Sequence, residues 1–270
     1  MNTEELKDIA TGIRISIDAK VHVGYPRSYL GMSQLGHGCA RYLWFYFRWA
    51  AKIEIDARKQ RIFDRGNLEE DRIVKSLESI GIIVEGRQTT LMDCDGHMQG
   101  HTDGFCHNVP DLPGVKVLLE MKSMKDVYWQ QLNKSDLKTV QKKYWAQDQT
   151  YMFYEGCKIG LQITTNKNDE MYDIQFVPYD RGAAELIVLR ARDIIYSKVA
   201  PRRLSDDPDY FECNWCEFQK QCHFHEPFAV NCRTCQNSHP GPNATWYCGD
   251  NPRTKQEVEE ACNLHIPIML

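Results

Sequence analysis

The chain has 270 residues, enough to bury a full hydrophobic core in one large domain or in one domain with an appendage. With 42% hydrophobic and 26% charged residues its composition is that of an ordinary globular protein, and no apolar run reaches the roughly 18 residues of a membrane span. The net charge of −4 excludes a basic coat over the whole surface, so local basic patches would have to bind any polyanion.

The predicted elements, in chain order, indicate a mixed α/β core. Residues 1–32 give no clear pattern. Helices are predicted over 33–51, 61–80, 138–156 and 180–199, and strands over 82–87, 97–106, 115–122, 158–165 and 171–178. A boundary follows at Pro201 and the run 206–209. We therefore expect a core over 1–205, a cysteine segment over 206–228 and a metal-binding module over 229–270.

The cysteines and the chain's first residues bear on its compartment. The first residues are charged and lack a signal-peptide segment, so we expect a cytoplasmic protein without a membrane partner. Eleven cysteines are many for such a protein, and seven of them fall within the last 58 residues. Metal binding explains that cluster better than a disulfide framework, which belongs to secreted chains.

The predicted helix 61–80 carries a carboxylate on its apolar side. Glu70 falls on the same face as Ile73, Val74 and Leu77, whereas Glu69 is expected on the solvated face. A carboxylate that points into a core needs a partner, unless it sits at the edge of the stripe and reaches water. Gly66, one turn earlier on that face, leaves room for such a partner.

The predicted strand 115–122 ends in Glu120-Met121-Lys122, whose alternation places Glu120 and Lys122 on one face. Asp103 ends the preceding strand-like stretch. Two carboxylates brought together can hold a hard divalent cation, and a neighbouring lysine can orient a water or stabilise phosphate charge. A cross-strand ion pair is the ordinary alternative for a Glu and a Lys at this spacing.

A polar and aromatic face follows on the predicted helix 138–156. Tyr144, Gln147 and Tyr151 share this face, where glutamine can bond the lysine or a phosphate and tyrosine can support a backbone or stack on a base. Two local basic stretches, 41–65 and 122–143, suit contacts with a phosphate backbone.

These motifs, in this order, resemble those of PD-(D/E)xK nucleases of the RecB and lambda-exonuclease type. The carrying motifs are Gly66-x-x-x-Glu70, Asp103 with Glu120-x-Lys122, and Gln147-x-x-x-Tyr151; Thr102 stands where the family name has proline. The resemblance covers about residues 33–225. It implies a restriction-endonuclease-like core with a mixed central sheet flanked by helices. It also implies a Mg2+-dependent deoxyribonuclease, an exonuclease rather than an endonuclease.

The resemblance further implies roles for individual residues. Asp103 and Glu120 would hold Mg2+ or Mn2+ with the backbone carbonyl of Met121, and Glu70 would complete the site directly or through water. Lys122 would position the attacking water. The expected partner is DNA with single- or double-stranded ends, processed for recombination or replication alongside a protein of those pathways. A phage-encoded protein of this kind would act in the host cytoplasm.

The first cysteine cluster consists of Cys213, Cys216 and Cys222, with Cys39 as the candidate fourth ligand. This distribution resembles the iron–sulfur staple of AddB-type nucleases and of the CRISPR adaptation nuclease. It implies a structural 4Fe–4S cluster that ties the two ends of the core together. The alternative is Zn2+ held by the same cysteines, or with His223 or His225 as the fourth ligand.

The second cluster predicts a zinc site in the last forty or so residues, since Cys-x2-Cys followed by further cysteines is typical of zinc modules. The predicted ligands are Cys232, Cys235, Cys248 and Cys262, with His265 competing for the fourth place and His239 less favoured. The spacing resembles a C-terminal zinc module of phage-type RecB-like exonucleases. The remaining cysteines, Cys94, Cys106 and Cys157, are expected to pack without a ligand.

Two other functions fit the same motifs. One is a nuclease fold without activity that serves as a DNA-binding module, although all four catalytic side chains are present. The other is an iron–sulfur nuclease that trims DNA for CRISPR adaptation, against which the extra zinc module argues.

Overall fold

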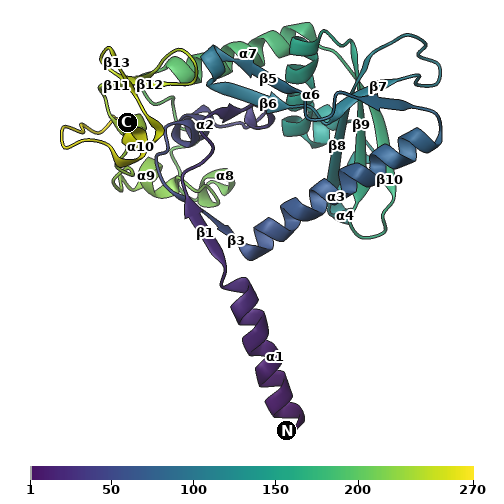
Figure 1. Cartoon of the computed structure of the whole chain (residues 1–270), viewed down its shortest axis with the longest axis horizontal. Helices are drawn as coiled ribbons and strands as arrows, with labels where there is room; N and C mark the ends of the chain where they lie inside the picture. The colour runs from purple at the N-terminus through teal and green to yellow at the C-terminus, as the bar shows by residue number, and fades with distance from the viewer. Residues whose placement is uncertain (1) are drawn as a thin grey trace.

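The computed structural model describes residues 2–270 as a mixed α/β molecule, with a five-stranded sheet at one end and the C-terminal segment at the other (Figure 1). The longer helices are α1 (Thr3–Asp18), α2 (Ala40–Phe47), α3 (Ala57–Ser79), α6 (Lys142–Glu155) and α7 (Arg181–Tyr196). The short ones are η1 (Met32–Gln34), η2 (Cys94–Gly96), α4 (Asp126–Leu132), α5 (Leu137–Val140), α8 (Phe211–Asn214), α9 (Gln219–His223), η3 (Cys232–Thr234) and α10 (Lys255–Glu260).

The central sheet has the strand order β10-β9-β8-β7-β4. Its members are β4 (Ile83–Glu85), β7 (Gly104–His107), β8 (Val117–Met124), β9 (Ile159–Asn166) and β10 (Tyr172–Pro178). The pair β8 and β9 is parallel and the other pairs are antiparallel, so the sheet is mixed. Helix α3 packs on one face and α6 on the other. The mixed sheet flanked by helices that the sequence predicted is therefore confirmed.

Alternation along β8 divides its side chains between the two faces. Val117, Leu119 and Met121 join the apolar cluster under α3, whereas Leu118 belongs to the larger cluster on the other side. Glu120 shares the face of Leu118 and is 1% exposed. The strand thus delivers a carboxylate into the interior at its carboxyl end, where helices cover both faces.

The predicted strand 97–106 is wrong as a single strand. It forms β6 (Met98–His101) and β7, which belong to different sheets, and Thr102 and Asp103 lie between them. β6 pairs with β2 (Leu30–Gly31) and β5 (Thr90–Asp93). Gly104 has φ +151°, a backbone conformation that side-chain-bearing residues rarely adopt, and it permits the change of direction directly after Asp103. Asp103 therefore sits at a corner rather than within a strand.

Two predicted helices are shorter or broken. The prediction over 33–51 becomes the separate elements η1 and α2, with Cys39 as the N-cap of α2. The prediction over 138–156 is divided at Gln141, whose φ of −134° and ψ of 64° are not helical. The end of α6 at Gly156, in the left-handed conformation, agrees with the sequence.

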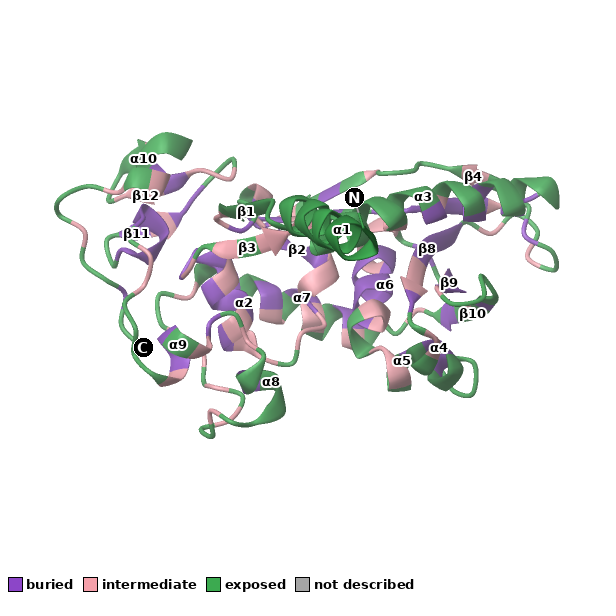
Figure 2. Ribbon diagram, turned by 90° about the horizontal axis from the view of Figure 1, so that it is seen from below, coloured by how far each residue is buried: buried purple, intermediate pink, exposed green. Residues whose placement is uncertain are grey.

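Part of the region that gave no pattern is also regular. α1 extends away from the body (Figure 1), its residues are exposed along its whole length (Figure 2), and β1 (Val21–Gly24) pairs with β3 (Ile53–Asp56). In residues 2–270, no helix combines the length and the apolar character needed to cross a bilayer.

The C-terminal segment forms a small sheet of β11 (Ser238–Pro240), β12 (Trp246–Cys248) and β13 (Asn251–Arg253). Two buried arginines connect it to the core. Arg48 donates to the carbonyl oxygens of Arg233 and Ser197, and Arg233 donates to the carbonyl oxygen of Phe47 at 2.9 Å. Because these guanidinium groups bond carbonyls across a sequence separation of about 150 to 190 residues, the segment is packed onto the core rather than tethered beside it.

Candidate active site

Asp103, Glu120 and Lys122 meet at the carboxyl end of β8. The Lys122 ammonium donates to Glu120 Oε2 at 2.8 Å and to the carbonyl oxygen of Met121 at 3.1 Å, and it lies 3.6 Å from Asp103 Oδ2. The Met121 N–H donates to Asp103 Oδ2 at 2.7 Å, which fixes the corner at Asp103 against β8. The corner before β7 and the end of β8 are thus brought to one point.

The ammonium occupies the centre of the oxygen set that the sequence assigned to a divalent cation. Asp103, Glu120 and the Met121 carbonyl are the three predicted ligands, and all three lie around Lys122 Nζ. Glu120 Oε1 is buried and has no hydrogen-bond partner within the described part of the chain. Oxygens of this kind are the donors that Mg2+ and Mn2+ prefer, so the residues present fit such an ion.

The charges of this group act strongly on one another. Burial and then the nearby Asp103 carboxylate raise the pKa of Glu120 well above its ordinary value. Burial opposes the charge of Lys122, but Asp103 and Glu120 outweigh it and raise the pKa of the ammonium. Gln147 Nε2 donates to Glu120 Oε2 at 2.8 Å and so fixes the carboxylate from α6. Lys122 is therefore held in its protonated form between the carboxyl groups of Asp103 and Glu120.

Glu70 lies at the opposite wall, on α3. It is half-buried, and its carboxylate is 3.9 Å from the Arg87 guanidinium. Burial, followed by the charge of Asp103, raises the pKa of Glu70. Glu70 is therefore close enough to Asp103 for the two carboxyl groups to interact. A Cβ on Gly66 would meet nothing within 4 Å, so the room expected one turn earlier exists.

The prediction that Glu69 faces solvent is wrong. Glu69 is 6% exposed, and its Oε1 accepts a hydrogen bond from Thr165 Oγ1 at 2.9 Å. Helical periodicity distinguishes faces only to within about one residue, and α3 crosses β9 where the strand ends in polar threonines. Thr165 in the sheet therefore provides a hydrogen bond to a carboxylate that the apolar pattern of the helix placed outside the core.

Gln147 and Tyr151 follow Glu120 on α6 as predicted, but with different surroundings. Tyr151 is 2% exposed, and a Cβ on Gly100 would stand only 2.6 Å from its ring. A tyrosine packed this closely supports the site and cannot stack on a base. Tyr144, one helical turn before Gln147 and 5.7 Å from the Lys122 ammonium, is the ring that reaches the surface.

Asp148 belongs to this group and was missed by the sequence reasoning. It is 2% exposed, neither of its oxygens has a partner among the described residues, and burial raises its pKa well above the ordinary value. The run 147–150 is buried throughout, so α6 carries polar side chains toward the sheet. The only signal was the polar run itself, which ordinarily marks an exposed face.

A cleft of about 340 Å3 opens onto the site. It lies between α3 and the end of β8, and Gly66, Glu69, Glu70, Lys122, Tyr144 and Lys167 are among the residues that line it. Asp103 and Glu120 are buried, so a substrate in the cleft would meet Lys122 and Glu70 directly.

The predicted basic surface over 41–65 is only partly available for phosphate. Arg41 and Arg48 are 9% and 1% exposed, and both donate to backbone carbonyls within the fold. Arg61 and Arg65 are paired with Asp18 and Glu170. These arginines join segments of the protein. A count of basic residues along the sequence does not distinguish this role from ligand binding.

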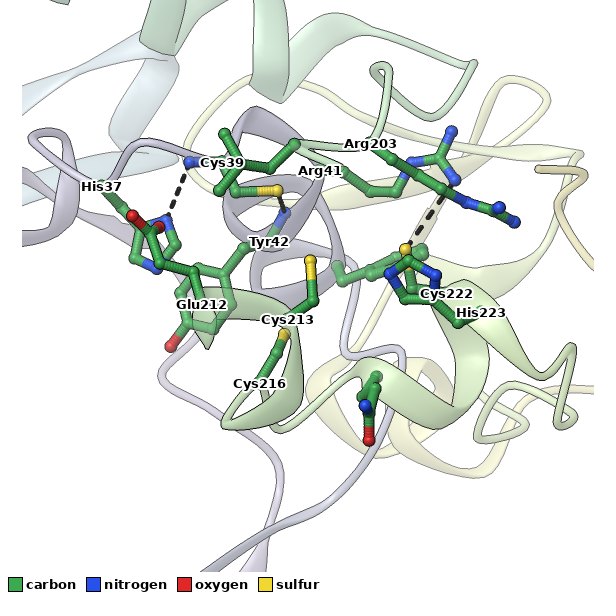
Figure 3. Close-up of a pocket in the computed structure, with 13 residues that line it drawn as sticks. His37, Cys39, Arg41, Tyr42, Arg203, Glu212, Cys213, Cys216, Cys222 and His223 are labelled. Atoms are coloured by element: carbon green, nitrogen blue, oxygen red, sulfur yellow. Dashed lines mark hydrogen bonds between the residues drawn. The ribbon is translucent and has the colours of Figure 1, made fainter. Parts of the chain in front are cut away.

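The four cysteines of the first cluster line one pocket and turn toward the same space (Figure 3). Cys39 comes from the start of α2, and Cys213, Cys216 and Cys222 come from the segment around α8 and α9. Cys39 Sγ accepts the Tyr42 N–H at 3.4 Å, and Cys216 Sγ accepts the Phe218 N–H at the same distance. These two bonds fix the orientation of the Cys39 and Cys216 side chains.

Two arginines add positive charge around that pocket. Arg41 and Arg203 line it, and Arg41 Nη1 lies 3.9 Å from Cys222 Sγ. Burial raises the pKa of Cys213 and, to about 11, that of Cys216, so these groups are neutral thiols at neutral pH until a metal displaces their protons. His223 also lines the pocket. His225 lines a different one, on the C-terminal side.

The second cluster surrounds a separate cavity. Cys232, Cys235, Cys248, Cys262 and His265 all line it, and His239 instead stacks on Tyr247. His265 Nε2 lies within hydrogen-bond distance of Thr234 Oγ1, at 3.2 Å, so the imidazole already has a partner. Cys94, Cys106 and Cys157 are buried and line neither cavity.

Neither cavity is closed around an ion-sized centre. Within residues 2–270, no three His, Cys, Asp or Glu side chains stand in the mutual positions of a metal site. In the candidate site the Lys122 ammonium holds the carboxylates, and the cysteines line two cavities. The donor sets are brought together by the fold, and their final spacing would depend on the group they bind.

No family model matches the chain, and no curated protein matches it. Among solved structures the chain is similar to SSO0001, at 16% identity and a TM-score of 0.42, over 82% of this chain and 95% of that one. It is similar to an alkaline exonuclease from Laribacter hongkongensis, at 14% identity and a TM-score of 0.45, over 62% of this chain and 86% of that one. It is also similar to a phage-related exonuclease from Haemophilus somnus 129PT, at 14% identity and a TM-score of 0.38, over 49% and 68% of the two chains. Likenesses at this level assign no activity.

Proposed function

We propose that the chain is a metal-dependent deoxyribonuclease that digests DNA from its ends. The observation that carries the proposal is the oxygen set of Asp103, Glu120 and the Met121 carbonyl, gathered around a cationic group beside an open cleft. A single ion pair does not account for this arrangement, because one ammonium offsets the charge of one carboxylate. Asp103 and Glu120 are both buried beside Lys122, and Glu70 stands at the opposite wall.

Asp103, Glu120 and the Met121 carbonyl would hold Mg2+ or Mn2+, and Glu70 would contribute directly or through water. When bound, such an ion polarises a phosphodiester and stabilises the departing 3′ oxygen. Lys122, displaced from the carboxylates toward the cleft it already lines, would hold the attacking water by hydrogen bonds. Gln147 would keep Glu120 in place by the bond it already makes.

Two further metal groups are proposed on the cysteines. Cys39, Cys213, Cys216 and Cys222 would hold a 4Fe–4S cluster, with Zn2+ as the alternative. The arginines beside that pocket would offset the negative charge of the thiolates. Its role would be structural, joining the segment 206–228 to the start of α2.

The segment 229–270 would bind Zn2+ through Cys232, Cys235 and Cys248. Cys262 is the proposed fourth ligand, and His265 is the competitor. Cys262 is favoured because it is the thiol whose charge most raises the pKa of Cys232 after burial, and because His265 is engaged with Thr234. Residues 1–205 would then form the nuclease core.

Digestion of labelled DNA tests the function. Purified protein with Mg2+ is expected to shorten end-labelled linear single- and double-stranded DNA and to leave a covalently closed circle of the same sequence intact. EDTA is expected to abolish cleavage, and Mn2+ to restore it. The proposal is wrong if metal-replete protein leaves every linear substrate intact, or if it cuts equally well in EDTA. Rapid cutting of the closed circle would contradict its exonuclease part.

A further inference from the structure

A second groove, larger than the active-site cleft, begins where that cleft ends. Its volume is about 940 Å3, and Tyr144 lines both spaces, so the two are contiguous at this ring. The groove runs between the loop that precedes α6 and the cysteine segment at α8. Its lining includes Tyr128, Lys142, Lys143, Tyr144, Phe211 and Trp215.

The aromatic rings of this groove are unusually open to solvent. Trp215 is 84% exposed, Phe211 is 65% exposed and Tyr128 is 49% exposed. Four of the other five tryptophans, by contrast, are no more than 3% exposed: Trp44, Trp49, Trp129 and Trp246. One exposed ring needs no explanation, but three along a single groove are an apolar surface that a ligand would cover.

Positive charge stands between the aromatic rings. Lys142 and Lys143 are exposed, and neither forms an ion pair with a carboxylate in the part of the chain that the structure describes. They open α6, whose N-cap, Gln141, makes no side-chain hydrogen bond to the first turn. Two unpaired lysines beside uncapped backbone N–H groups favour an anion at this point of the groove.

The groove is also lined by two acidic residues, Glu212 and Glu217, and both are exposed. Glu212 Oε2 lies 3.7 Å from the position of a Cβ on Gly38, directly before α2. Glu217 is close to Tyr42, whose pKa is raised by burial and then by that carboxylate. Both carboxylates therefore neighbour the start of α2, whereas the two lysines stand at the start of α6 and form a basic edge there.

The groove has a rigid floor. A Cβ on Gly36 would stand 2.5 Å from the Cα of Lys143 and 2.9 Å from the Cβ of Ala146. The loop before α2 thus touches the first turn of α6 without an intervening side chain, and the backbone that carries Lys143 is held against this loop. A preformed groove loses little conformational entropy when it binds.

We propose that this groove binds a single strand of DNA as it leaves or enters the active site. Successive bases would stack on Tyr144, Trp215 and Phe211, and phosphates would contact Lys142 and Lys143. The bases of a duplex are already stacked and paired, so exposed rings in a row select unpaired bases. This inference rests on the proposed function, since the occupant is the substrate of the adjoining cleft.

Binding measured without cleavage tests the groove separately from the chemistry. In EDTA, a fluorescein-labelled oligothymidine is expected to bind more tightly than a blunt hairpin duplex of equal phosphate content, by fluorescence anisotropy. Trp215→Ala is expected to weaken oligothymidine binding roughly 5- to 100-fold, the range for loss of one stacking platform. Trp215→Phe should restore most of it, because the ring is retained. Phe224→Ala removes another exposed ring of the cysteine segment, outside the groove, and should bind normally.

Salt dependence separates the lysines from the rings. The plot of log affinity against log salt has a negative slope. In the double variant Lys142→Ala with Lys143→Ala this slope is expected to become shallower by about 1.4, as for the loss of two phosphate contacts on a single strand. Trp215→Ala should leave the slope unchanged. Addition of oligothymidine should also quench tryptophan emission in the wild type and not in Trp215→Phe, since Trp215 is the most exposed tryptophan.

The failures of the two proposals are distinguishable. If Trp215→Ala melts like the wild type and binds oligothymidine equally tightly, the groove assignment is overturned, whatever the cleavage assay shows. Equal affinity for the hairpin duplex and the oligothymidine, or binding to a peptide in place of DNA, would also overturn it. If single-strand binding requires the groove but no metal ion supports cleavage, the groove stands and the nuclease proposal falls.

Discussion

Glu120→Gln is expected to lower the rate of Mg2+-dependent DNA cleavage on the order of 10³-fold, equivalent to about 4 kcal/mol in the activation free energy. The change removes one of two buried carboxylates from the proposed ion site and keeps the volume of the side chain. In the wild type, Glu120 Oε2 accepts hydrogen bonds from both Lys122 Nζ and Gln147 Nε2 at 2.8 Å. In the variant only the oxygen of the amide can accept these bonds, and its NH2 group cannot. Single-turnover digestion of an end-labelled strand measures the effect.

Stability is expected to move differently from activity. Burial raises the pKa of Glu120, so at neutral pH its charge is less favourable in the folded than in the unfolded chain. The change also withdraws a negative charge from the buried Lys122 ammonium, which works in the opposite direction. The melting temperature of Glu120→Gln should therefore stay close to that of the wild type, and a variant that loses cleavage but melts normally has lost chemistry rather than fold.

The pair of Glu155 and Lys116 provides the matched control. It joins the same residue types at 2.7 Å, well outside the site, near the beginning of β8. Glu155→Gln is expected to change cleavage by less than about twofold, because an exposed pair of this kind contributes at most about 1 kcal/mol to stability. Equal rates for Glu120→Gln and Glu155→Gln would remove the basis for assigning the site to β8.

The second large effect is expected for Cys39→Ser. Loss of this ligand opens a loop that runs from the start of α2 to Cys213, and closing a loop of that length stabilises a fold by about 4–5 kcal/mol in the chain-entropy model. The free energy of unfolding should therefore fall by several kcal/mol, measured by urea denaturation under anaerobic conditions. Cys157→Ser, a buried cysteine outside both cavities, serves as the control and should lose about 1 kcal/mol.

Metal analysis decides which group the cysteines hold. Wild-type protein purified without oxygen is expected to be brown and to contain iron and zinc, and Cys39→Ser is expected to lose the iron and keep the zinc. Zinc alone in the wild type would replace the iron–sulfur assignment by the zinc alternative. A melting curve unaffected by Cys39→Ser would contradict the structural role itself.

Much of the candidate site follows from short-range regularities. Strand alternation predicts that Glu120 and Lys122 share a side, and helical periodicity places Glu70 on the sheet side of α3. The cysteine spacing predicts two separate groups, and two cavities contain them. The first two features depend on residues within one element, where period fixes direction, and the third depends on short spacings along the chain.

What the sequence did not reveal depends on contacts between elements. The burial of Glu69 requires Thr165 from another strand, and the division of 97–106 requires a second sheet on which β6 can pair. Arg48 is a residue type that often binds phosphate, but here it is buried in the core and donates to the carbonyl oxygens of Arg233 and Ser197. No local pattern encodes such partners. Thr165 lies 96 residues from Glu69, and Ser197 lies 149 residues from Arg48. Leu30 of β2 pairs with Met98 of β6 from an earlier part of the chain.

Manganese binding tests the central claim most directly, because Mn2+ can be followed by its electron paramagnetic resonance and avoids the thiols as a hard ion. Wild-type protein is expected to bind Mn2+ at the β8 site. Asp103→Asn keeps an oxygen for the Met121 N–H but loses the charge, and should weaken binding at least about tenfold. Asp8→Asn, on the exposed helix α1, should bind as the wild type does. Equal Mn2+ affinity in Asp103→Asn and the wild type would contradict the account.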